Sequence, residues 1–170
     1  MKKLKHSHKL LNTSKIHSII FDWKRTLYDP DTKKLINGSK DLLKMLKDKN
    51  IPLFLIGKGN LEMLKEVGRL GIKDLFADIS FVEGNKNTEQ FEPFIDKDNP
   101  KSSIVIGDRV QSELSIGKSL HTTTIWVKQG KFADEIPLDE TQTPTYTVQS
   151  LQEVKELLKR TISQGNPQNN

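Results

Sequence analysis

The chain has 170 residues, of which 34% are hydrophobic and 29% charged, and it contains no cysteine. This length suits one domain with a single core, and the lack of cysteine excludes disulfides, zinc–cysteine sites and thiol catalysis. No apolar run approaches the roughly 20 residues of a membrane helix, and no apolar stretch follows the basic start as it would in a signal peptide. We therefore expect a soluble protein of the cytoplasm that has no membrane partner.

The formal net charge of +5 comes from the first residues of the chain. Residues 1–15 contain five lysines and no acid, which leaves 22 basic against 22 acidic residues in the rest. A short basic arm can bind nucleic-acid phosphates, although a solvated, mobile terminus is more common. We predict a flexible basic arm over 1–14, one α/β domain over 15–162 and a disordered polar tail over 163–170.

Apolar strand patterns alternate with helical patterns along this domain. The first half predicts a strand over 16–21, a hairpin over 28–36, a helix capped by Ser39, a strand over 52–56, a helix from Asn60 to Gly71 and a strand over 79–82. The second half predicts a helical piece over 88–95, strands over 103–106, 123–127 and 146–148, and helices over 110–120 and 151–160. Such alternation is typical of a three-layer α/β/α sandwich, a parallel sheet with helices on both faces.

Three of the predicted strands end in polar residues. Asp22 ends the first strand, Gly57-Lys58-Gly59-Asn60 follows the second, and Gly107-Asp108 ends the strand over 103–106. Ligands of open parallel sheets bind beyond the carboxyl ends of the strands. We therefore expect these side chains to meet at one edge of the sheet.

Three carboxylates are expected at this edge, because Glu113 follows Asp108 by five residues. Carboxylates brought together repel one another unless a cation lies between them, and hard oxygen ligands suit Mg²⁺, which shares its shell with a phosphate. An aspartate beside such an ion can attack phosphorus and form an aspartyl-phosphate. Asp22 and Asp108 could also be ordinary turn formers at strand ends, but the set with Glu113 favours a metal site.

The set resembles the haloacid dehalogenase (HAD) superfamily, in which a strand ends in D-x-D-x-T and a Ser/Thr, a Lys and G-D-x(3,4)-[D/E] follow. The resemblance covers about residues 16–130 and is best over IVIGDRVQSELSIGK and TTTIWVKQG. It implies a Rossmannoid fold and Mg²⁺-dependent phosphatase or phosphotransferase activity on a phosphorylated substrate.

The resemblance also implies a role for each matching residue. Asp22 would be the nucleophile and a Mg²⁺ ligand, and Asp108 and Glu113 would complete the metal site. Thr26 would orient the first loop. Lys86, 22 residues before Asp108, would offset the charge of the nucleophile and the phosphate.

Both of the first two family motifs are degenerate in this chain. Lys24 stands where the family has its acid/base Asp; its backbone carbonyl can still be a metal ligand, but a lysine is a poor base at neutral pH. General acid–base catalysis is typically worth about 10²–10⁴ in rate. Gly57 replaces the Ser/Thr of the second motif. Gly57 and Lys58 could bind phosphate through backbone N–H groups and the ammonium, or the segment could be only a tight turn capped by Asn60.

The gaps between the motifs are too short for a cap domain. An open site favours a large substrate, or a protein partner or second copy that covers it. Two functions therefore remain open: a slow or atypical Mg²⁺-dependent hydrolase, and a HAD-like protein without turnover that binds a phosphorylated ligand or a protein. Nucleic-acid binding through the basic arm is a third, less supported hypothesis. Trp126 is expected in the core, whereas Trp23 could pack or line the site.

Overall fold

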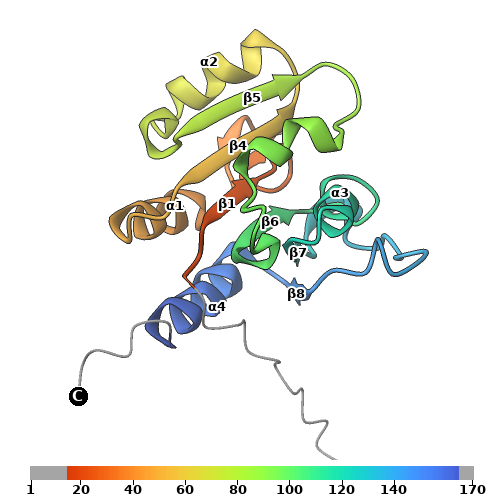
Figure 1. Cartoon of the computed structure of the whole chain (residues 1–170). Helices are drawn as coiled ribbons and strands as arrows, with labels where there is room; N and C mark the ends of the chain where they lie inside the picture. The colour runs from red at the N-terminus through yellow and green to blue at the C-terminus, as the bar shows by residue number, and fades with distance from the viewer. Residues whose placement is uncertain (1–14, 165–170) are drawn as a thin grey trace, which may run out of the picture.

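The computed structural model describes residues 15–164, so the predicted arm over 1–14 and most of the predicted tail lie outside the described residues. In this described part of the chain, six parallel strands form one sheet in the order β5-β4-β1-β6-β7-β8 (Figure 1). The strands are β1 (Ser18–Phe21), β4 (Leu53–Lys58), β5 (Asp78–Val82), β6 (Ser103–Gly107), β7 (Thr123–Val127) and β8 (Tyr146–Val148). The predicted parallel sheet is therefore confirmed.

Within residues 15–164, four α-helices are packed on the two faces of the sheet. They are α1 (Ser39–Asp48), α2 (Leu61–Arg69), α3 (Glu113–Ser119) and α4 (Leu151–Gln164). Side chains alternate between the faces of a strand, so Ile19 and Phe21 of β1 join the core with α1 and α4, whereas Ile20 joins the core with Leu114 of α3. The three-layer α/β/α sandwich follows from this alternation.

Some elements differ from the sequence-based expectations for local reasons. The predicted helix over 88–95 is two short 3₁₀ turns, η2 (Thr88–Gln90) and η3 (Glu92–Phe94), because Pro93 cannot continue a helix. The helix predicted to begin at 110 begins at Glu113. The last helix extends to Gln164, past the predicted domain boundary at 162.

The prediction that Ser39 caps α1 is wrong. Gly38 occupies the N-cap position with φ of 88°, a left-handed conformation that favours glycine. Ser39 is buried and donates its hydroxyl to the carbonyl of Leu27 at 2.9 Å. This hydrogen bond ties the start of α1 to the loop that follows β1.

A short hairpin follows that loop, as predicted. Its strands, β2 (Tyr28–Asp29) and β3 (Lys34–Leu35), pair antiparallel. The Tyr28 ring stacks on Trp23 with centroids 4.7 Å apart, and its hydroxyl donates to Glu66 of α2 at 3.0 Å. Trp23 is fully buried, so it packs and does not line the site. The hairpin and α2 thus fix both ends of the loop that carries Lys24 and Arg25.

No cap domain is inserted in residues 15–164. Between β1 and β4 the chain forms only the hairpin and α1, and between β4 and β6 it forms α2, β5 and short 3₁₀ turns. Within the same range, none of the helices combines the length and the apolar composition that a bilayer crossing requires.

Candidate functional site

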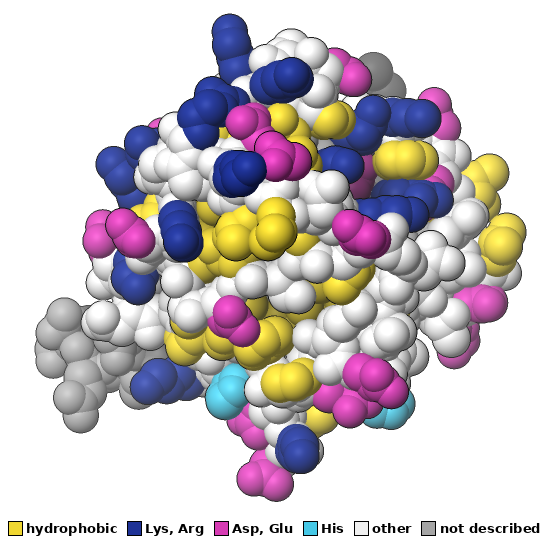
Figure 2. All heavy atoms as spheres, turned by 90° about the horizontal axis from the view of Figure 1, so that it is seen from above, with side chains coloured by type: hydrophobic (Ala, Val, Ile, Leu, Met, Phe, Trp, Pro, Cys, Tyr) yellow, Lys and Arg dark blue, Asp and Glu magenta, His cyan; other side chains and the backbone are white. Residues whose placement is uncertain are grey.

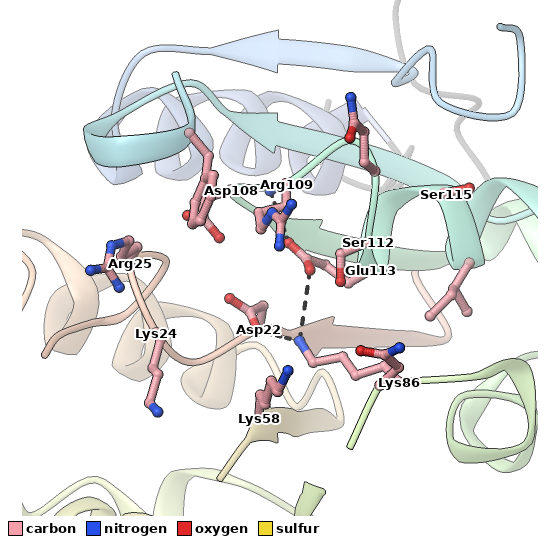
Figure 3. Close-up of a pocket in the computed structure, with 14 residues that line it drawn as sticks. Asp22, Lys24, Arg25, Lys58, Lys86, Asp108, Arg109, Ser112, Glu113 and Ser115 are labelled. Carbon is pink, nitrogen blue, oxygen red and sulfur yellow. Dashed lines mark hydrogen bonds and ion pairs between the residues drawn. The ribbon is translucent and has the colours of Figure 1, made fainter. Parts of the chain in front are cut away.

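The ends of β1, β4 and β6 meet at one pocket of about 510 Å³, as the sheet topology predicts. Asp22, Lys58 and Asp108, which end or follow these strands, all line it. Figure 3 shows their side chains turned toward one another with Lys86 among them. The convergence expected from three strand ends is therefore present in the fold.

The base of the pocket is an acidic floor formed by Asp22, Asp108 and Glu113. Each carboxylate offers one oxygen within 4.8 Å of the others. The three residues are 7%, 2% and 2% exposed. Asp22 is held in place by its own N–H, which donates to the carbonyl of Ile106 at 3.0 Å.

Gly107 makes room for Glu113 to join the floor. A Cβ at Gly107 would lie 2.1 Å from Glu113 Oε1 and 2.4 Å from its Cγ, so any larger residue there would force the Glu113 side chain to move. The N–H of Arg109 donates to the same Oε1 at 3.0 Å. Glycine at the end of β6 is thus a packing requirement for this position of Glu113, because α3 folds its first side chain back over the strand end.

Lys86 supplies the cation of the floor. Its ammonium forms an ion pair with Asp22 Oδ1 and lies 3.7 Å from Glu113 Oε2, and its side chain is only 5% exposed (Figure 3). Burial disfavours this charge, but the carboxylates of Asp22 and Glu113 outweigh it and leave the pKa of Lys86 raised. Thr26 donates to the other Asp22 oxygen at 2.9 Å. Both oxygens of the Asp22 carboxylate are therefore oriented.

One ammonium does not balance three buried carboxylates. Burial and the charges of Asp22 and Glu113 raise the pKa of Asp108 to about 9, and burial with the Asp22 charge also raises the pKa of Glu113. The buried Oδ2 of Asp108 has no hydrogen-bond partner within residues 15–164. A clustered, acid-rich donor set with an orphaned oxygen fits a hard divalent cation such as Mg²⁺.

Above the floor, the wall of the pocket carries a basic rim formed by Lys24, Arg25, Lys58 and Arg109. Lys58 points toward Asp22 and Lys86, whereas the side chain of Lys24 extends away from Asp22 (Figure 3). Arg109 pairs with Glu135 at 2.8 Å and lies over the Phe132 ring at 4.2 Å.

Gly57 lies within β4 and does not line the pocket. A Cβ there would lie 2.4 Å from the Phe81 ring and 2.8 Å from Trp23 Cβ, so no hydroxyl-bearing side chain fits without moving the ring. The N–H of Gly59 donates to Val82, and Asn60 caps α2 by accepting from Glu62 at 3.0 Å. The structure therefore confirms the tight turn capped by Asn60. Phosphate binding by Gly57 stays a prediction.

Sequence reasoning missed several residues that line the pocket, among them Arg109 and Phe132. Arg109 directly follows Asp108 in the sequence, and this position next to the Gly-Asp pair could have identified it as a pocket residue. Phe132, on the 3₁₀ turn η5 (Gly130–Phe132), carries no sequence signal. Trp126, predicted as core, is 4% exposed and also donates from Nε1 to the carbonyl of Asp108 at 3.0 Å, which positions that strand end.

Comparisons with known proteins agree with this geometry. A family model described as HAD-hydrolase-like matches residues 57–154. The chain is 29% identical over 132 residues to a glyceraldehyde 3-phosphate phosphatase of Pyrococcus furiosus, covering 74% of this chain and 55% of that protein. It is 27% identical to a protein of the same description from Methanocaldococcus jannaschii, covering 67% of this chain and 52% of that protein. The chain thus spans about half the length of the curated relatives it matches.

Solved structures share the fold. A Bacillus subtilis protein described as a HAD-hydrolase and solved bound to magnesium superposes with a TM-score of 0.62 at 23% identity, covering 74% of this chain and 57% of that one. A HAD-superfamily hydrolase from Ehrlichia chaffeensis superposes with a TM-score of 0.66 at 14% identity, covering 88% of this chain and 98% of that one.

Proposed function

The chain belongs to the HAD-hydrolase-like family, and on that premise we propose that it hydrolyses phosphate monoesters, or transfers their phosphoryl group, with Mg²⁺ through an aspartyl-phosphate on Asp22. The observation that carries the proposal is the acidic floor: three buried carboxylates, of which Asp22 is oriented on both oxygens and Asp108 has one oxygen without a hydrogen-bond partner within residues 15–164. The likeness to two glyceraldehyde 3-phosphate phosphatases supports phosphomonoester chemistry.

Asp22, Asp108, Glu113 and the backbone carbonyl of Lys24 would hold Mg²⁺, which offsets the carboxylate charges and polarises a phosphoryl oxygen. Lys86 stays within the floor, where its charge lowers the repulsion between Asp22 and the incoming phosphate. Thr26 holds the Asp22 carboxylate in one orientation, so less motion is needed before attack.

In the reaction, a carboxylate oxygen of Asp22 attacks phosphorus, and the bond between phosphorus and the ester oxygen breaks. The leaving alkoxide takes a proton from water. A water molecule then hydrolyses the aspartyl-phosphate, which releases inorganic phosphate and restores the Asp22 carboxylate. Lys58, which points toward Asp22 (Figure 3), is placed to bind a phosphate oxygen during both steps.

Lys24 makes turnover slow for ordinary alkyl esters. No carboxylate occupies its position to donate a proton to the leaving group or to activate the water, and the loss of such catalysis costs about 10²–10⁴ in rate. Aryl phosphates need less proton donation because phenolates are better leaving groups. We therefore expect aryl phosphates to react faster than alkyl phosphates.

A second function, binding of a phosphorylated ligand or a protein without turnover, is favoured by one observation. Lys24 extends away from Asp22 (Figure 3), so the position that normally handles protons does not reach the nucleophile. In that case the floor would hold the metal and the ligand, and no aspartyl-phosphate would be hydrolysed.

Hydrolysis of p-nitrophenyl phosphate separates these two functions. The wild type should hydrolyse it only with Mg²⁺, and Asp22→Asn should lose more than about 10³-fold in kcat, as expected for a lost nucleophile. Asp48→Asn, which removes an exposed carboxylate at the end of α1, is the matched control and should keep the rate. Equal residual rates in wild type and Asp22→Asn would show that Asp22 does not turn over substrate.

A further inference from the structure

We propose that the basic rim forms a second anion subsite next to the catalytic floor, so that the natural substrate is a small phosphate ester carrying a second phosphate or a carboxylate. The inference deepens the proposed function and rests on it. It concerns which substrates the pocket selects. It is argued from the basic side chains of the rim that the proposed phosphoryl transfer does not use.

The charges that line the pocket do not balance. Five basic side chains line it against three acidic ones. Lys86 is committed to Asp22 and Glu113 in the floor, and Arg109 is neutralised by Glu135. Three cations of the rim remain, and a phosphate group brings a charge of only about −1.5 to −2. With Lys58 directed at the transferred phosphate, Lys24 and Arg25 are left without an anion.

These cations also lack strong partners in the protein itself. Within residues 15–164, Lys24 and Lys58 make no ion pair, and Arg25 has only Asp31, at 3.9 Å. Asp31 is 82% exposed, and such solvent-exposed pairs contribute little. Although the chain after residue 15 is neutral, lysine and arginine side chains are concentrated in the upper half of the view from above (Figure 2).

The backbone at Arg25 is unusual as well. Arg25 has φ of 65°, in the left-handed region that favours glycine. Its carbonyl accepts from the Gln129 side chain at 3.3 Å, which helps to hold this conformation. The side chain stands between the catalytic pocket and a neighbouring hollow of about 430 Å³ that Lys131 also lines. A guanidinium placed there can bind a carboxylate or phosphate with two hydrogen bonds.

The occupant is a small molecule and not an extended polyanion. The pocket and the neighbouring hollow, about 510 and 430 Å³, have the size of small-ligand sites. Asp29 and Asp31 line the hollow beside Arg25, and they would repel a phosphate chain that ran onward past it. A compact substrate with two anionic groups satisfies the rim and avoids these acids.

Calorimetric titration with two phosphonates tests the subsite without any turnover. Propane-1,3-diphosphonate carries a second anion that propylphosphonate lacks, and both resist hydrolysis. At fixed ionic strength with Mg²⁺ in excess, the wild type should bind the diphosphonate at least about tenfold more tightly, as one charge-assisted hydrogen-bonded contact would give. Equal affinities for the two compounds would overturn the inference.

Arg25→Gly identifies the residue responsible. Glycine accepts the left-handed conformation, so this variant removes the guanidinium without straining the backbone. The ratio of the two affinities should fall several-fold toward one. The matched control is Lys33→Gly, because Lys33 also has a positive φ, of 54°, and one positive charge, but lies in the hairpin outside the pocket; it should keep the ratio. An unchanged ratio in Arg25→Gly would contradict the assignment.

Two further outcomes keep the inference separate from the proposed function. If p-nitrophenyl phosphate is not hydrolysed but the affinity ratio behaves as expected, the second subsite stands and the phosphatase proposal fails. If hydrolysis occurs and the ratio is one, the phosphatase proposal stands and the subsite fails. Tighter binding of a 5′-phosphorylated oligonucleotide than of the diphosphonate would instead indicate a nucleic-acid ligand, and would overturn the small-substrate inference.

Discussion

The acidic floor and the basic rim lie in the same pocket but are built differently. In the floor, Asp22 is oriented by Thr26 and Lys86, and the carboxylates are at most 7% exposed. In the rim, Lys58 is exposed, the Arg25 side chain is 25% exposed, and the one close ion pair joins Arg109 to Glu135. The floor thus has one fixed arrangement, whereas the rim keeps freedom to adjust to a ligand.

Because of this difference, we expect the floor to carry out the chemistry and the rim to select the substrate. A rigid, preorganised floor suits phosphoryl transfer, in which positioning and electrostatics supply most of the rate. Long side chains with few internal partners suit recognition of a charged substrate. Changes in the floor should therefore alter stability, metal binding and kcat, and changes in the rim should alter which phosphate esters react.

Removal of the floor cation should have the largest effect on stability. Lys86→Met leaves buried carboxylates without their partner, which costs about 3–5 kcal/mol when one member of a buried pair is removed. Urea unfolding in EDTA should show this loss, and Mg²⁺ should restore part of it by replacing the missing charge. Lys40→Met, at an exposed position of α1, should be neutral. Equal unfolding midpoints for the two variants would show that the floor does not need its cation.

Conversion of a rim position into an acid should raise activity. Lys24→Asp places a carboxylate where the family has its acid/base, and we expect hydrolysis of an alkyl phosphate to rise by about 10² or more. Lys34→Asp makes the same charge change on the exposed strand β3 and should leave the rate unchanged. If Lys24→Asp gives no gain at any pH between about 5 and 8, the missing acid/base is not what limits turnover.

Gly107→Ala should disturb the floor by steric means. Because the added Cβ would meet Glu113 at 2.1 Å, the carboxylate must move, at a cost of about 1–3 kcal/mol for overpacking. Calorimetry should show weaker Mg²⁺ binding together with the lower stability. At Gly68 of α2 a Cβ would meet nothing within 4 Å, so Gly68→Ala serves as the control. Unchanged Mg²⁺ affinity in Gly107→Ala would remove Glu113 from the metal site.

Loss of the Glu66 carboxylate, which accepts from Tyr28 and so holds the hairpin next to the rim against α2, should have the smallest effect on stability. The effect should depend on pH. The hydrogen bond from Arg69, with that from Tyr28, lowers the pKa of Glu66 from 4.5 to about 2. Because the pKa of Glu66 is lower in the folded state, the stabilisation that its ionised carboxylate gives to the fold is present above pH 4.5 and is lost as the pH falls toward 2. Glu66→Gln should therefore melt lower than wild type at neutral pH, and the difference should shrink in this acid range.

Melting curves of Glu62→Gln provide the comparison for that experiment. Glu62 pairs with Lys65 on the exposed surface of α2 and with no other cation within residues 15–164, so its replacement should change the melting temperature little at any pH. A difference between wild type and Glu66→Gln that stays constant down to about pH 2 would contradict the ion-pair origin of the effect.

The floor could be predicted from the sequence because its signals are local. Strand ends follow from the apolar patterns, parallel topology brings the ends together, and the spacing from Asp108 to Glu113 identifies the third acid. The reason why Gly107 precedes Asp108 could not be predicted, because it depends on the way α3 folds Glu113 back over β6.

The rim could not be predicted because it depends on backbone conformation and on contacts between distant segments. Nothing in the residue order indicates a positive φ at Arg25, or that Phe81 fills the space beside Gly57. Lys24 was a candidate for proton transfer by its place in the motif, yet its side chain extends away from Asp22. The helix predicted over 88–95 was wrong for a local reason instead, because Pro93 cannot continue a helix.

A thermal shift with Mg²⁺ and beryllium trifluoride tests most directly whether the floor accepts a phosphoryl group on Asp22. Beryllofluoride mimics a phosphoryl group on an aspartate, and a ligand of the folded state raises the melting temperature by mass action. Wild type should be stabilised only when both additives are present, and Asp22→Asn should not respond to the pair. No shift in the wild type, or the same shift in Asp22→Asn, would contradict the account.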